Sequence, residues 1–386
     1  METLEPAAAP ADLNSDIAAM VGEIAVVGPR VPEIARRLGR HKETVRYWYK
    51  KLEDSEFAIQ AILNHEALGL RRVVLKVRFG AQYTDYISPL MFAMNEQCYV
   101  TSYAKALPED VYLIHASVPA ERVDEYLRFV EALRDQGVFL AVDWYHFDWF
   151  RNRPMRADSY DFETGHWDLD MPSLLRAEAS PFSEPTVSAR VKFDRLDLLI
   201  AKELQSDATR EMQEVQRAIK ERDGLDVNYK TMCWHLGEHV EANGLIKGFR
   251  INWMGSRWDP VVDRARHRSH TYVVVYVLVK GPTPEERHGI LRMLDRLPVV
   301  WAEAGGEDCY AEIAFPSEML MDGLKFLNAV MAKVHEKVDY HIMDQRSAIG
   351  FTFSYQLYDE ETRAWIFNAE ELLVKFKALE AQIRNV

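Results

Sequence analysis

The residues best suited to chemistry lie in a short basic stretch near the N-terminus, Val31 to Leu52 (VPEIARRLGRHKETVRYWYKKL). From Arg30 to Lys51 the chain has eight Lys or Arg but only two acids, Glu33 and Glu43, whereas the whole chain carries a formal net charge of -13. Lys and Arg are attracted to phosphates, and a helix in the major groove reads base edges with Arg, Lys, His or Thr. The pattern therefore favours binding of double-stranded DNA. The alternative is a helical hairpin whose charges only keep it soluble.

Two helices around a tight turn would position these side chains. Val31–Leu38 has apolar residues three and four apart, with Pro32 in its first turn, and Gly39 permits a left-handed turn. The second helix, Lys42–Leu52, would bury Val45, Leu52 and either Trp48 or Tyr49. Helix, turn and basic helix form the helix-turn-helix pattern. We expect DNA contacts from the exposed side of this unit, at Arg40, His41, Lys42, Thr44, Arg46, Tyr47 and Lys50.

A second pattern, His235-Leu-Gly-Glu-His239, matches the H-x-x-E-H signature of inverted zinc proteases. Two His four residues apart can share one zinc ion, with Glu238 as the base. However, the chain has twelve His, Gly237 weakens the helix, and the motif lies where His and Glu would face DNA or solvent. We therefore predict neither a metal nor a cofactor. Spacing alone assembles no Ser/His/Asp group.

Length and composition limit the class of protein. A chain of 386 residues should contain two or more domains. No apolar run approaches the length of a membrane helix, and the first residues lack the features of a signal peptide. The three Cys are far apart and form no C-x-x-C pair. These features predict a cytoplasmic protein without a membrane partner.

Predicted helices and strands follow the same order twice. Each half begins with three predicted helices and a strand that would be the wing of a winged helix. The elements that follow are strand, helix, strand, strand, helix and strand, which is the order of a ferredoxin-like domain. The fold class is therefore α+β with internal duplication. The expected divisions are a disordered lead (1–12), a first winged helix-turn-helix (13–66), a first ferredoxin-like domain (67–149), a linker (150–192), a second winged helix-turn-helix (193–256), a second ferredoxin-like domain (257–367) and a C-terminal helix (368–386).

The second recognition helix is weaker in positive charge than the first, because Lys230 is accompanied by Glu238 and Glu241. Equal DNA binding by both halves is therefore in doubt. Its expected contacts are Asn228, Tyr229, Lys230 and Thr231, and a basic connector follows at Arg264, Arg266, His267 and Arg268.

Several segments carry a resemblance to a known family. They are IARRLGRHKETVRYWYKKL, FAIQAILNHEALGL, LDLLIAKEL and EANGLIKGFR. The chain resembles the leucine-responsive regulatory protein (Lrp/AsnC) family of bacteria and archaea, as a tandem version of archaeal type covering residues 13–148 and 193–355. The resemblance implies a sequence-specific transcription regulator rather than an enzyme. Its ferredoxin-like domains would pair through their sheets, giving a homodimer or higher homo-oligomer, and would sometimes bind a small-molecule effector.

Two other functions remain open. Some tandem proteins with this pairing of folds are decarboxylases of siroheme-type tetrapyrroles that resemble Lrp-type regulators but have lost DNA binding. In that case His115, His146 and several Arg would contact propionates or iron. We favour the regulator because the first recognition helix exposes Lys42, Arg46 and Lys50, a face that such an enzyme would not need. A scaffold protein is the third alternative, and exposed aromatic residues in 150–167 would favour it.

Overall fold

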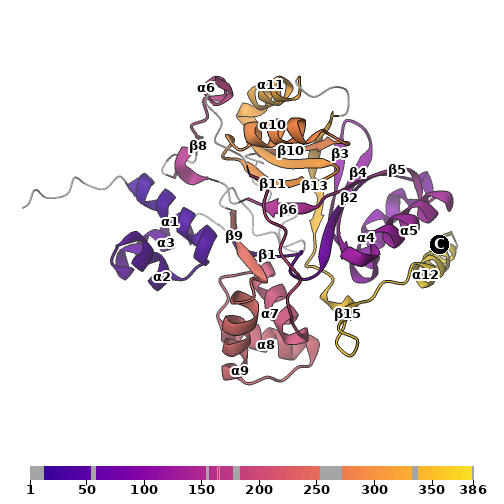
Figure 1. Cartoon of the computed structure of the whole chain (residues 1–386), viewed down its shortest axis with the longest axis horizontal. Coiled ribbons are helices and arrows are strands. Elements are labelled where there is room, and N and C mark those ends of the chain that lie inside the picture. Colours follow the sequence, from indigo (N-terminus) through magenta and orange to yellow (C-terminus); the bar gives the residue numbers. More distant parts are fainter. Residues whose placement is uncertain are drawn as a thin grey trace, which may run out of the picture.

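A computed structural model describes residues 13–53, 58–153, 156–162, 164, 166–176, 183–252, 272–332 and 338–384. The expected lead (1–12) and the basic connector at 264–268 lie outside these ranges. Figure 1 shows two small helical units beside one large sheet that has helices packed against it. Among the described helices, none combines the length and apolar character needed to cross a membrane.

The first helical unit agrees closely with the sequence prediction. Its helices are α1 (Leu13–Val27), α2 (Val31–Leu38) and α3 (Lys42–Glu53). Gly39 ends α2 in the left-handed conformation, with φ at 62°, which glycine adopts without the steric cost of a Cβ atom. Of the two aromatic candidates for the core side of α3, Trp48 is buried whereas Tyr49 is half-buried.

The second helical unit consists of α7 (Arg195–Ser206), α8 (Met212–Asp223) and α9 (Tyr229–Trp234). The third helix of this unit does not continue as a regular α-helix, because the chain widens after Trp234 into a π-helical segment, His235–Glu241. Asn228 caps α9, since its side chain accepts a hydrogen bond of 2.9 Å from the Thr231 N–H.

The strands expected as wings are exchanged between the two units. β1 (Ala58–Leu63) pairs antiparallel with β9 (Ile246–Asn252). β9 packs on α1 of the first unit, and β1 packs on α7 of the second. Phe249 of β9 lies over Gly28, directly after α1. Each strand was expected to complete the unit that precedes it, so this pairing is a correction.

The large sheet contains nine strands that come from both halves of the chain. Each half uses the order fourth, first, third, second, which gives β5-β2-β4-β3 and then β13-β10-β12-β11. A pairing of β3 with β13 joins the halves, and β6 extends the sheet beyond β11. The strands are β2 (Leu70–Phe79), β3 (Val100–Leu107), β4 (Val111–Pro119), β5 (Phe139–His146), β6 (Trp149–Asn152), β10 (Tyr272–Val279), β11 (Val300–Gly305), β12 (Cys309–Pro316) and β13 (Val338–Gly350).

Helices cover one face of each half-sheet, as Figure 1 shows: α4 (Ile87–Cys98) and α5 (Val123–Asp135) on the first, α10 (Pro284–Leu294) and α11 (Leu320–Met331) on the second. The opposite faces look toward each other. His115 on β4 and Tyr310 on β12 have ring centroids 5.5 Å apart, although three strands separate β4 from β12 in the sheet. The sheet therefore curves back on itself, and its inner faces enclose a common interior.

The remaining segments wrap around this body. Residues 150–192, expected as a linker, contain β6, β7 (Tyr160–Asp161), β8 (His166–Trp167) and α6 (Met171–Arg176). Near the C-terminus, β14 (Tyr358–Asp359) and β15 (Ala364–Trp365) precede α12 (Ala369–Arg384), which packs on α5. Short 3-10 turns lie at Ala81–Tyr86, Ala120–Arg122, Ala157–Ser159, Ser317–Met319 and Tyr355–Leu357.

Candidate functional site

A half-buried arginine, whose Nε is fully shielded from solvent, is the most unusual group between the two half-sheets. Arg72 lies on β2, where strand alternation directs it inward. Its Nη1 donates a hydrogen bond of 2.6 Å to Thr101 Oγ1, and its guanidinium lies 4.9 Å from the ring centre of Phe150. Arg72 forms no ion pair within 4.0 Å among the described residues, and its buried Nε has no hydrogen-bond partner there. Burial lowers the Arg72 pKa to about 10, so the group is still a cation at neutral pH.

Beside Arg72 lies a hydrogen-bonded series of three titratable side chains. The Tyr310 hydroxyl donates to a Glu312 carboxylate oxygen at 3.2 Å and lies 3.5 Å from His115 Nε2. Burial, together with the charge of Arg72, lowers the His115 pKa to about 3, so its imidazole is neutral at pH 7. Burial also raises the Glu312 pKa. His115, Tyr310 and Glu312 can therefore hold and relay a proton in a site from which water is largely excluded.

A second polar group bridges the two halves further along the same interior. Lys76, four residues after Arg72 on β2, pairs with Asp339 of β13 at 2.8 Å. The Tyr145 hydroxyl of β5 donates to the same carboxylate at 3.4 Å. Next to them His341 is buried, and neither of its ring nitrogens has a hydrogen-bond partner in the described structure. Both halves of the chain thus contribute to one polar interior.

A cavity of about 270 Å³ adjoins this interior where β1 and β9 meet β6. Phe150 links the two, because its ring lines the cavity and also contacts Arg72. His65 lines the same cavity, and burial, with the charges of Arg72 and Lys247, holds its pKa well below the usual value. Lys247 pairs with Glu66 at the wall. The volume is near the lower end for small-molecule sites, and the lining is Ala25, Ile62, Leu63, His65, Glu66, Phe150, Arg151, Asn152, Lys247 and Gly248.

Another hollow, of about 420 Å³, lies on α8 away from this interior. Its Arg210 and Arg222 are already paired with the buried carboxylate of Glu203. Because these charges are satisfied, this hollow offers weaker recognition of a ligand than the cavity beside Arg72.

The residues predicted as DNA contacts lie elsewhere, on the two helical units. Several of the charged ones are engaged with acids: Arg46 with Glu43 at 2.6 Å and Arg40 with Asp16 at 3.1 Å. Their assignment as DNA contacts stays a prediction. All of the first set are exposed, namely Arg40, His41, Lys42, Thr44, Arg46, Tyr47 and Lys50; in the second set Asn228, Tyr229 and Lys230 are exposed and Thr231 is half-buried.

Sequence reasoning overlooked most of the interior. It named His115 and His146 only for the decarboxylase alternative, and of these His115 belongs to the proton-holding series. His146 instead pairs with Glu307 at 3.0 Å. Arg72, Tyr310 and Glu312 were missed. A signal was present in β2 (LRRVVLKVRF), because Arg72 and Lys76 are four residues apart and therefore lie on the same face of the strand.

Comparison with known proteins gives matches by structure alone. No protein-family model and no curated protein matches the chain. The structure of the siroheme decarboxylase NirDL superposes with a TM-score of 0.50, at 11% identity, over 94% of this chain and 99% of that chain. NirDL in co-complex with an iron-uroporphyrin III analogue gives 0.48, at 10% identity, over 88% and 94%. AsnC of E. coli gives 0.27, at 16% identity, over 36% of this chain and 95% of that chain.

These matches correct the functional prediction from sequence. An enzyme, the siroheme decarboxylase NirDL, shares the fold along nearly the whole chain. The prediction of a DNA-binding transcription regulator without enzymatic activity is therefore wrong. The likeness itself concerns the fold, a mixed α+β arrangement around a large antiparallel sheet.

Proposed function

We propose that this chain is an enzyme that removes carboxyl groups from a siroheme-type iron tetrapyrrole, the alternative considered from the sequence. In this interpretation α1–α3 and α7–α9 are two winged helix-turn-helix units, and the two half-sheets are ferredoxin-like domains. The proposed divisions remain those expected from sequence, except that the units exchange the strands β1 and β9. The full-length fold match to NirDL supports the class of reaction, and the chain's own interior supports the class of substrate.

The observation that carries the proposal is the unpaired charge of Arg72, a half-buried side chain whose buried Nε has no partner among the described residues. Removing a guanidinium from water is costly unless an anion and several hydrogen bonds compensate it. Arg72 has one hydrogen bond, to Thr101, and no carboxylate partner among the described residues. An entering carboxylate would supply the missing charge, and Arg binds carboxylates in a two-pronged geometry. A substrate rich in acetate and propionate groups has the matching chemistry.

The neighbouring side chains suit the bond changes of decarboxylation. The bond between the carboxylate and its side-chain carbon breaks, CO₂ leaves, and the electron pair remains on that carbon, conjugated with the macrocycle. One proton must then replace the lost CO₂. We infer that the Tyr310 hydroxyl donates this proton and regains one from solvent by way of Glu312 and His115, which lie 3.2 and 3.5 Å from it.

The cavity beside Phe150 limits how the substrate would lie. Its volume of about 270 Å³ accommodates one acetate or propionate side chain of the substrate, here called the acidic arm, rather than a complete macrocycle. We propose that the arm enters toward Arg72 while the ring system lies over the mouth, between β1 and β9 on one side and β6 on the other. Arg151 and Lys247 also line this region, but they are paired with Glu303 and Glu66, so Arg72 is the cation that we assign to the substrate.

The test is anaerobic incubation of the purified chain with siroheme. Binding is followed by the absorption spectrum of the tetrapyrrole, and products are followed by mass spectrometry as losses of CO₂. The informative variant is Arg72→Met, and Arg128→Met on the exposed side of α5 is the matched control. Loss of a charge-assisted pair worth about 1.5–3 kcal/mol should weaken binding by about 10- to 100-fold in Arg72→Met only.

Three outcomes would overturn the proposal. The first is no bound tetrapyrrole in the unchanged chain. The second is binding without loss of CO₂, which would remove the enzymatic function. The third is equal binding by Arg72→Met and Arg128→Met, which would remove Arg72 from the site.

A further inference from the structure

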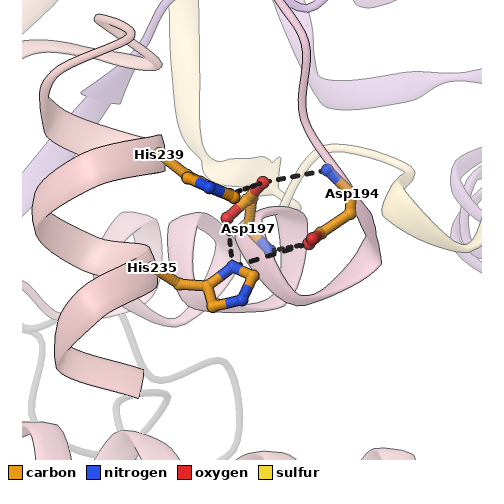
Figure 2. A group of neighbouring side chains, drawn as sticks. All are labelled: Asp194, Asp197, His235 and His239. Atoms are coloured by element: carbon orange, nitrogen blue, oxygen red, sulfur yellow. Dashed lines mark hydrogen bonds and ion pairs between the residues drawn. The ribbon is translucent and has the colours of Figure 1, made fainter. Parts of the chain in front are cut away.

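Four potential metal ligands meet in the second helical unit, more than 100 residues along the chain from Arg72 and in a different part of the fold. Asp194 caps α7, and Asp197 lies in its first turn. His235 and His239 lie on the π-helical segment that follows α9. Figure 2 shows the two imidazoles pointing toward the two carboxylates, which come from the facing start of α7. One ligand atom from each residue lies within 4.8 Å of the others.

The separations between these atoms fit a small cation. His235 Nδ1 is 2.8 Å from Asp197 Oδ1 and 3.7 Å from Asp194 Oδ1, and His239 Nδ1 is 3.2 Å from Asp197 Oδ2. Tetrahedral zinc with bonds of 2.0–2.1 Å to nitrogen and oxygen places its ligand atoms about 3.3 Å apart. The three observed separations lie on either side of this value, so small rotations of the His and Asp side chains would bring their ligand atoms to tetrahedral positions.

The charge of the group also fits a divalent cation. Two carboxylates and two imidazoles offer oxygen and nitrogen ligands, and the described structure places no Lys or Arg within 4.0 Å of either carboxylate. Asp197 is fully buried. A buried carboxylate without a cation is costly, and here it is compensated by the two imidazoles and by the Asp194 N–H at 2.9 Å. A bound divalent ion would neutralise the whole group.

We propose that Asp194, Asp197, His235 and His239 bind one transition-metal ion of the zinc type. Imidazole and carboxylate together suit Zn²⁺ and its neighbours such as Co²⁺. Four protein ligands fill a tetrahedral shell, which is typical of structural rather than catalytic zinc. The ion would fasten the π-helical segment to the start of α7. π-helical turns inserted in helices occur frequently at functional sites.

This arrangement differs from the zinc-protease chemistry considered from the sequence. Both His of the H-x-x-E-H motif belong to the group, but Glu238, the base of that motif, is exposed and lies outside it. Asp194 and Asp197, which no motif indicated, take the remaining ligand positions. The motif therefore identified two ligands of the group and suggested the wrong chemistry for it.

The test uses Co²⁺ as a spectroscopic probe of the full chain after treatment with a chelator. The unchanged protein should bind one equivalent and develop the visible absorption of tetrahedral Co²⁺, which Zn²⁺ should abolish by displacement. His239→Ala should weaken binding by at least about 100-fold, since a ligand is lost. The matched control is Glu238→Ala, one residue earlier on the same turn, which should bind as the unchanged protein does.

A second variant separates metal binding from folding. Asp194→Asn keeps an oxygen that can cap α7 but removes one charge, so it should fold with an unchanged circular dichroism spectrum and bind Co²⁺ more weakly. Absence of Co²⁺ binding by the unchanged chain would show a hydrogen-bonded cap only and would overturn the proposal. Equal binding by His239→Ala and Glu238→Ala would overturn it as well.

Discussion

Replacing Arg72 by Met should make the ligand-free protein more stable, although it should weaken the binding of carboxylates. The fall of the Arg72 pKa from its ordinary 12.5 to about 10 corresponds to about 3 kcal/mol of penalty on the buried charged form. Against this, the variant loses the hydrogen bond to Thr101 and the contact with the Phe150 ring, together worth about 2 kcal/mol. Thr101 keeps a partner, because its hydroxyl also donates to the His115 carbonyl oxygen at 3.2 Å.

The expected net change is a gain of about 1 kcal/mol in the free energy of unfolding. Urea unfolding at pH 7, followed by circular dichroism, would measure it for Arg72→Met, for Arg128→Met and for the unchanged chain in parallel. Arg128→Met should change stability by less than about 0.5 kcal/mol, because its side chain is exposed. A loss of more than about 1 kcal/mol in Arg72→Met would show that the guanidinium stabilises the fold, and the reasoning from an unpaired charge would fail.

Two further predictions concern stability. The His115 pKa is about 3 in the folded chain and 6.5 when unfolded, so the unfolded state binds more protons between these values and the free energy of unfolding falls as pH drops from 6.5 toward 3. His115→Gln should remove about 2 kcal/mol of the loss in stability between pH 7 and pH 5. Equal shifts of the urea midpoint between these pH values in the variant and in the unchanged chain would contradict this. Gly28 and Gly39 both have positive φ, but a Cβ atom at Gly28 would lie 2.7 Å from the Phe249 ring, whereas Gly39 has open space. Gly28→Ala should therefore cost about 2–4 kcal/mol and Gly39→Ala about 1 kcal/mol in urea unfolding, and equal losses would contradict the close contact.

Local patterns in the sequence predicted local structure well. The bounds of α2 were correct because its apolar residues recur at helical spacing and because Gly39 provides a definite stop. The order of strands and helices along each half of the chain was also predicted correctly. In both cases the deciding interactions join residues that are close in the chain, or they obey a known connection rule.

Interactions between distant segments could not be predicted in this way. Periodicity identified β1 and β9 as strands but says nothing about which strand each one pairs with. The polar interior depends on β4 facing β12 across the curved sheet, so the series of His115, Tyr310 and Glu312 is invisible in the linear order. The charge on α3 stands out in one short stretch of sequence, whereas the role of Arg72 on β2 depends on its distant neighbours. The function predicted from sequence therefore followed α3.

The exchange of β1 and β9 has a consequence for the integrity of the molecule. Each helical unit borrows its outer strand from the opposite half of the polypeptide, so a fragment ending before residue 193 would retain β1 without β9 and would leave α1 uncovered. Such a fragment could recover a complete unit only by reciprocal donation from a second fragment. Because both halves belong to one chain, the exchange takes place within a single molecule, and the halves contribute different residues to one asymmetric interior: Arg72 and His115 from the first, Tyr310 and Glu312 from the second.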